Sequence, residues 1–120
     1  MDIADLIALR KDLHAHPELR FEEFRTSDIV ANVHTSLGYC PSRGLAKTGV
    51  VASLQGKKPG PSIILRADMD ALPINEQGDH SHSSRHPGRM HACGHVGHTT
   101  MLLGAAAELA LNPPERGTVH

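Results

Sequence analysis

The sequence predicts an α/β fold, in which helices flank a mixed sheet. Apolar residues recur with helical spacing near both ends of the chain, and short aliphatic runs separated by glycine and proline lie between them. At 120 residues, positions 1–120 have room for one domain at most. The chain holds one Tyr, two Phe and no Trp, so its core would rest on small and aliphatic side chains.

Two helices are expected in the first third of the chain. Residues 3–15 carry isoleucine and leucine at helical spacing, and Pro17 ends the pattern. Residues 22–37 repeat apolar side chains every four positions, and Gly38 is suited to cap the end. The acidic residues between the two helices are expected to act as helix-terminal charges and caps: Glu18, Glu22 and Glu23.

The middle of the chain predicts two short strands. Residues 39–48 read as a loop and residues 49–55 as the first strand. Residues 56–61, with the sequence Gly-Lys-Lys-Pro-Gly-Pro, predict a turn. Residues 62–67 contain three consecutive aliphatic residues and predict a second, more buried strand. The two strands are expected to pair as a hairpin.

A polar segment and a third helix follow. Residues 75–90 are rich in His and Ser and have no periodicity, which predicts either an ordered loop over a site or disorder. A helix is expected from about residue 95 to residue 111, and residues 117–120 resemble the start of another strand. The buried face of the helix is predicted to hold Leu102, Ala105, Ala106 and Leu109.

Composition excludes several functional classes. A net charge of -1 gives no electrostatic basis for binding nucleic acid or an anionic membrane. No apolar run is long enough to span a membrane, and the acidic N-terminus does not resemble a signal peptide. Cys40 and Cys93 lie in unlike contexts, which favours reduced thiols and a cytoplasmic location. Cys40 is expected to be a small apolar filler.

The densest chemical signal is one thiol and three imidazoles between His91 and His98. Thiolate and imidazole are the ligands that borderline-soft divalent metals prefer. Cys93 and His95 could reach one ion if Gly94 bends the backbone with a positive φ. Metal ligation is favoured over ordinary polar loop residues because three further histidines stand just upstream: His80, His82 and His86.

A second reading of the same residues stays open. Cys93 could be a thiol nucleophile activated by a neighbouring imidazole. No Asn or Asp lies beside these histidines to orient such a base, which makes this reading weaker than metal ligation.

Two carboxylates, Asp68 and Asp70, follow the second predicted strand. Residues two apart on a strand project to the same side, so both could bind a metal or orient a ligand. The plain alternative is a solvated turn in which Arg66 pairs with one of them.

Several motifs together resemble the metal-dependent amidohydrolases of the aminoacylase and carboxypeptidase type, in the branch of hippurate hydrolases and auxin-conjugate hydrolases. The resemblance covers nearly the whole chain. It rests on LRKDLHAHPEL (9–19), GVVA (49–52), LRADMDALPI (65–74), PGRMHACGH (87–95), GHT (97–99) and MLLGAA (101–106).

The resemblance implies a zinc-peptidase-like α/β catalytic domain with an inserted lid domain. It implies two divalent metals per complete site, zinc or manganese, and a glutamate as general base. By position, Cys93 and His95 correspond to metal ligands and Asp70 to the acidic residue that supports the site. Asp68 and His98 are weaker candidates, as partners of the ligands.

Two departures from the family stand out. Val96 occupies the position after the ligand histidine, where the family usually has Asp, so orientation of that ligand should be weaker. The paired-glutamate motif that supplies the general base is absent, as are the lid domain and the later histidines. The chain is thus expected to be an incomplete N-terminal part of the catalytic domain.

The resemblance implies hydrolysis of small-molecule amides such as N-acyl amino acids, with homo-oligomerisation left open. The 120 residues alone are expected to be inactive. The alternative is a non-catalytic protein that binds zinc or nickel through its His-rich loop, or that pairs with a full-length relative.

Overall fold

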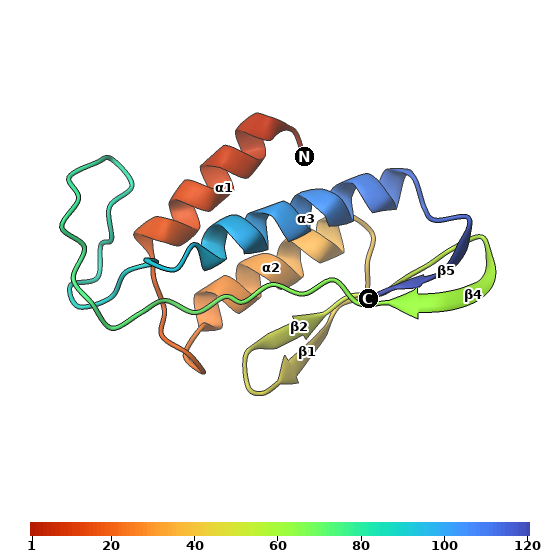
Figure 1. Cartoon of the computed structure of the whole chain (residues 1–120), viewed down its shortest axis with the longest axis horizontal. Helices are drawn as coiled ribbons and strands as arrows, with labels where there is room; N and C mark the ends of the chain where they lie inside the picture. Colours follow the sequence, from red (N-terminus) through yellow and green to blue (C-terminus); the bar gives the residue numbers. More distant parts are fainter.

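The computed structural model describes residues 1–120. Three helices, α1 (Ile3–Ala15), α2 (Phe24–Ser36) and α3 (His95–Leu111), form one side of the molecule. α3 packs against both α1 and α2 and lies between them (Figure 1). None of these helices has the length and apolar character that a membrane crossing requires. All three predicted helices are confirmed, with ends within two residues of the expected ones.

Five strands form two small sheets. β1 (Ser42–Leu45) and β2 (Gly49–Val51) make an antiparallel hairpin. β3 (Leu54–Gln55), β4 (Lys58–Ile63) and β5 (Arg116–Val119) form a second sheet in the order β3-β5-β4. β5 pairs antiparallel with β3 and parallel with β4, so the predicted mixed sheet is confirmed.

Three predictions about the strands were wrong. Residues 39–48 are not a loop throughout, because β1 lies within them. Residues 49–55 form two strands, since the chain leaves the hairpin after Val51 and enters the other sheet at Leu54. The predicted hairpin does not form, because β5 lies between β3 and β4. Only the distant β5 could decide this pairing.

The Pro-Gly-Pro sequence at residues 59–61 lies in β4 rather than in a turn, and residues 64–67 are not a strand. β4 is an edge strand, where a missing N–H on the outer side costs nothing. Its register with β5 shifts between Lys58 and Ser62, which accommodates the prolines. β4 is exposed along its length, so the expectation of a more buried strand was also wrong.

Carboxylate side chains bind backbone N–H groups at the start of the first two helices, although the N-cap residue of α2, Glu23, makes no such bond itself. Asp2 and Asp5 form a reciprocal capping box at the start of α1. The Glu18 carboxylate accepts hydrogen bonds from the backbone N–H groups of Arg25 and Thr26 and from the Thr26 hydroxyl. The predicted capping role of Glu18 is therefore confirmed, and the capped residues lie in the first turn of α2.

The buried face of α3 differs from the prediction. Its buried residues are Val96, Thr99, Thr100, Leu103, Ala106 and Ala107. Of the predicted stripe only Ala106 is buried, because α1 and α2 cover the adjacent side of the helix. Leu102 and Leu109 are half-buried and line a hollow of about 750 Å³ between α3 and the hairpin. Cys40 is exposed and is not the apolar filler that was predicted.

Candidate metal centre

His95 is the first residue of α3, and the turn before it depends on Gly94. Gly94 is the N-cap residue with φ 87°, in the left-handed region that glycine adopts without strain. The expected bend is therefore present. It directs the chain from the loop into the helix and places His95 over the extended segment that follows β4.

The imidazole of His95 is held by Asp70. Its Nδ1 lies 2.9 Å from the Asp70 carboxylate and 2.9 Å from the Asp70 backbone carbonyl. Both partners are acceptors, so Nδ1 carries the proton and Nε2 keeps a free lone pair. This carboxylate–imidazole arrangement is the one that orients histidine ligands toward metals.

Asp68 lies on the other side of the same ring. Its carboxylate oxygen is 4.0 Å from His95 Nε2. The Asp68 carbonyl accepts a hydrogen bond of 2.9 Å from the Thr99 hydroxyl, one turn along α3. Arg66 pairs with Asp68 at 2.5 Å, so the predicted pairing with one of the two carboxylates is observed. The first turn of α3 thus fastens both acidic residues beneath it.

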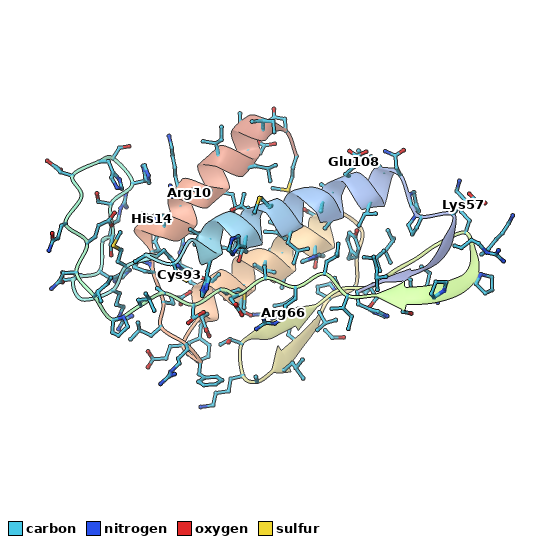
Figure 2. All side chains as sticks on the ribbon, in the orientation of Figure 1. Arg10, His14, Lys57, Arg66, Cys93 and Glu108 are labelled. Atoms are coloured by element: carbon cyan, nitrogen blue, oxygen red, sulfur yellow. The ribbon has the colours of Figure 1, made fainter.

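Cys93 lies in the turn before α3, with its thiol free and exposed (Figure 2). It does not join His95 and either acidic residue in a group with three ligand atoms within 4.8 Å of one another. His95 commits Nδ1 to Asp70, which leaves that nitrogen unable to activate the thiol. The thiol-nucleophile reading therefore gains no support from this geometry.

The two other histidines of the motif have different environments. His98 is exposed, and its ring centroid lies 6.4 Å from that of His95. His91 is 4% exposed, and neither of its ring nitrogens has a hydrogen-bond partner. Burial, with smaller contributions from the neighbouring imidazoles of His14 and His95, lowers the pKa of His91 to about 4. His91 is consequently neutral at physiological pH.

Comparison with known proteins identifies the family of this chain. The model of peptidase family M20/M25/M40 matches residues 64–120, which contain every residue of the candidate centre. A dinuclear metal-binding peptidase of the M20 family from Bacillus subtilis superposes with a TM-score of 0.92 at 40% identity, over 97% of this chain and 33% of that one. This chain belongs to the M20 peptidase family.

Several relatives carry the names of amidohydrolases. An N-acyl-L-amino acid amidohydrolase of Geobacillus stearothermophilus is 51% identical over 102 residues, which are 85% of this chain and 28% of the relative. An IAA-amino acid hydrolase of Arabidopsis thaliana is 45% identical over 95% of this chain and 26% of its own length. The predicted family resemblance is confirmed, and the chain spans less than a third of each relative.

The donor set of the candidate centre fits a divalent metal. His95 offers an oriented imidazole nitrogen and Cys93 an accessible sulfur, which suits a borderline-soft ion. Val96, the departure from the family, is 2% exposed and belongs to the core. The family resemblance implies Asp at this position, and Val96 offers no carboxylate there.

The sequence did not reveal a second cluster outside the M20 motif. His14, Glu76 and His80 form the only group whose three ligand atoms lie within 4.8 Å of one another. Of the three residues, only His80 was singled out in the sequence, as one of the histidines just upstream of the motif. His14 lies on α1, 62 residues before Glu76, and no local pattern joins the two.

Proposed function

We propose that these residues form part of the metal centre of an M20 amidohydrolase that hydrolyses N-acyl amino acids or related small amides. The observation that carries the proposal is the His95 ring, held by Asp70 with Nε2 free, two residues after the exposed thiol of Cys93 in the chain. The named activity of the Geobacillus relative supports the substrate class.

Within this proposal, Cys93 and His95 hold the metal and Asp70 orients His95. The bound metal pair, zinc or manganese, supplies Lewis-acid activation of water and of the amide carbonyl. A thiolate ligand favours zinc of the two. Asp70 keeps the proton on Nδ1 of His95, so that Nε2 remains a ligand atom. The free cysteines agree with a reducing, cytoplasmic setting.

Cobalt titration of the chain tests the ligand assignment. A cobalt–thiolate charge-transfer band in the near ultraviolet is expected, because Cys93 coordinates as a thiolate. Cys93→Ser should abolish the band, and Cys40→Ser, which removes the other exposed thiol, should leave it unchanged. Asp70→Asn should weaken binding by about 10–100-fold, the usual effect of losing a ligand's hydrogen-bond partner.

Hydrolysis is tested in a chimera. Residues 1–120 replace the matching segment of the Geobacillus amidohydrolase, which supplies the remainder of the catalytic domain. The chimera should hydrolyse an N-acyl amino acid, and Cys93→Ser should remove this activity while Cys40→Ser retains it. An inactive but folded chimera, or one indifferent to Cys93→Ser, would contradict the proposal.

A further inference from the structure

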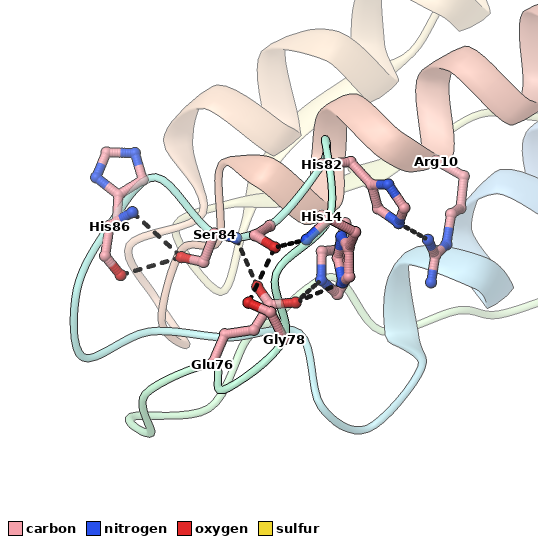
Figure 3. Close-up of polar contacts among 9 residues, drawn as sticks. Arg10, His14, Glu76, Gly78, His82, Ser84 and His86 are labelled. Carbon is pink, nitrogen blue, oxygen red and sulfur yellow. Dashed lines mark hydrogen bonds and ion pairs between the residues drawn. The ribbon is translucent and has the colours of Figure 1, made fainter.

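A second cluster of ligand-type side chains lies between the end of α1 and the loop of residues 75–90. Figure 3 shows Glu76 facing His14, with His82 and Arg10 close by. The cluster shares no residue with the candidate M20 centre. Its members are Glu76 and His80 from the loop and His14 from the last turn of α1.

The distances within this cluster are close to those of a metal site. Oε1 of Glu76 lies 2.9 Å from Nε2 of His14 and 3.0 Å from Nε2 of His80. Ligands bound to zinc at 2.0–2.1 Å in a tetrahedron are separated by about 3.3 Å. Small side-chain adjustments would therefore place an ion among the three atoms.

Burial favours an additional occupant. The side chains of Glu76 and His14 are 4% and 6% exposed, and Nδ1 of His14 is buried without a partner. Burial alone would raise the pKa of Glu76, but hydrogen bonds from His14 and Ser84 outweigh it and hold the pKa below its usual range. Glu76 is thus a carboxylate ready to act as a ligand.

A structural ion pair would need only one imidazole. Here Glu76 Oε1 contacts two, and a third imidazole, His82, has its ring centroid 4.0 Å from that of His80. Nε2 of His82 pairs with Arg10 at 3.1 Å, which leaves His82 outside the ligand group and the fourth position open. Three protein ligands and one open position are an ordinary zinc arrangement.

Two backbone links hold the loop in this place. The N–H of Arg85 donates to the carbonyl of Ala15 at the end of α1, at 2.9 Å. Leu72 and Met90 exchange backbone hydrogen bonds of 2.9 and 3.0 Å and close the base of the loop. The ligands on the loop are therefore positioned against α1 before any ion binds.

We propose that His14, Glu76 and His80 form a zinc site, separate from the M20 centre, that joins the loop of residues 75–90 to α1. The site takes neutral imidazoles and a carboxylate, a donor set that also accepts Ni²⁺ and Cu²⁺. When zinc binds, Nε2 of His14 and Nε2 of His80 each exchange the proton that faces Glu76 for the metal, and that proton moves to Nδ1 of the same ring or, if Nδ1 already carries one, to solvent.

The test uses zinc and the untagged chain carrying Cys93→Ser and His95→Asn, which removes the M20 ligands. Calorimetric titration should show one zinc bound, and zinc should raise the melting temperature in this background. Adding His80→Asn should weaken binding by more than the roughly 10–100-fold that a supporting partner contributes. His80 is 41% exposed, so this substitution leaves the core intact.

His86→Asn is the matched control, because His86 is an exposed histidine of the same loop outside the cluster. The zinc affinity of the His86→Asn chain should be unchanged, and that of the Glu76→Gln chain should be reduced. Absence of zinc binding in the double-variant background, or equal affinity in folded His80→Asn and His86→Asn chains, would overturn the proposal. The cobalt spectrum distinguishes the two proposed sites, because only the site that contains Cys93 gives a thiolate band. Each proposal can therefore be contradicted without affecting the other.

Discussion

His95 depends on Asp70 for its usefulness as a ligand. The two residues are 25 positions apart, and the contact forms because the first turn of α3 lies over the segment that follows β4. Asp70 thereby fixes which nitrogen carries the proton. The chemistry of the centre rests on this single long-range pair more than on the density of histidines around it.

Val96→Asp tests the departure from the family at the residue scale. The added carboxylate is expected to tighten metal binding at the centre, because the family resemblance implies an Asp at this position and a carboxylate there would help to orient the ligand histidine. It should also lower the free energy of unfolding, since Val96 is 2% exposed and a buried charge is costly. Metal titration and urea unfolding measure the two effects separately. Unchanged metal affinity in a folded variant would contradict the first expectation.

Tyr39 is expected to make stability depend on alkaline pH. Its hydroxyl donates a buried hydrogen bond of 2.8 Å to the carbonyl of Ala106, and burial raises the pKa of the phenol above 10.0. The unfolded chain therefore loses this proton first. The contribution of Tyr39 to the free energy of unfolding is complete below pH 10.0, and it disappears as the pH rises through the pKa of Tyr39 in the folded chain.

Tyr39→Phe should accordingly cost about 1 kcal/mol at neutral pH through the lost hydrogen bond. In urea unfolding at about pH 11, the difference in free energy of unfolding between the native protein and Tyr39→Phe should be smaller, because the Tyr39 hydrogen bond no longer stabilises the native protein there. A gap that stays constant from neutral to alkaline pH would show that Tyr39 does not titrate with folding.

At the scale of elements, α3 has two apolar faces with different partners. One face packs against α1 and α2. The other holds Leu102 and Leu109 and faces the hollow above the β1–β2 hairpin. Leu103, which is 1% exposed, lies in the core and also reaches the lining of the hollow. The stripe predicted from the sequence included Leu102 and Leu109 of the second face. Leucine spacing alone shows that both faces are apolar, but it does not show which face is packed more tightly.

Leu103→Ala and Leu102→Ala form a matched pair for this difference. Leu103→Ala should destabilise the chain by about 2–5 kcal/mol, since it opens a cavity in a packed core. Leu102→Ala should cost about 1 kcal/mol, because its side chain is only partly removed from water. Urea unfolding of both variants measures the difference, and equal losses would mean that the hollow is as well packed as the core.

At the scale of the whole molecule, one long polar segment is as important as the helices. Residues 75–90 form an ordered loop that extends beyond the ends of α1 and α3 (Figure 1). It was predicted as either ordered or disordered. The loop is ordered because it forms hydrogen bonds to α1 and across its own base. These bonds hold Glu76 against His14.

The 120 residues alone are predicted not to hydrolyse an N-acyl amino acid, even with zinc or manganese present. The proposed site has only two metal ligands, Cys93 and His95, and Asp70 is committed to His95 rather than free to act as a general base. A chromogenic N-acyl amino acid assay of the pure chain checks this. Metal-dependent turnover that Cys93→Ala abolishes would contradict it.

Local pattern was enough to predict the three helices and the bend at Gly94, and the motifs around Asp70 and Cys93 carried the resemblance to the family. These features depend on residues close in the chain: the leucine spacing of α1, the glycine before His95, and the motifs around Asp70 and Cys93. Short-range sterics and periodicity act within a few residues, so they can be read without the fold.

Tertiary structure alone decided the remaining features. β5 separates β3 from β4, Asp70 holds His95, and His14 meets Glu76 and His80 across 62 positions or more. Strand order and side-chain meetings of this kind depend on how whole elements pack, because many distant partners satisfy the same local pattern equally well. Packing against α1 selected the loop conformation and, with it, the proposed zinc site.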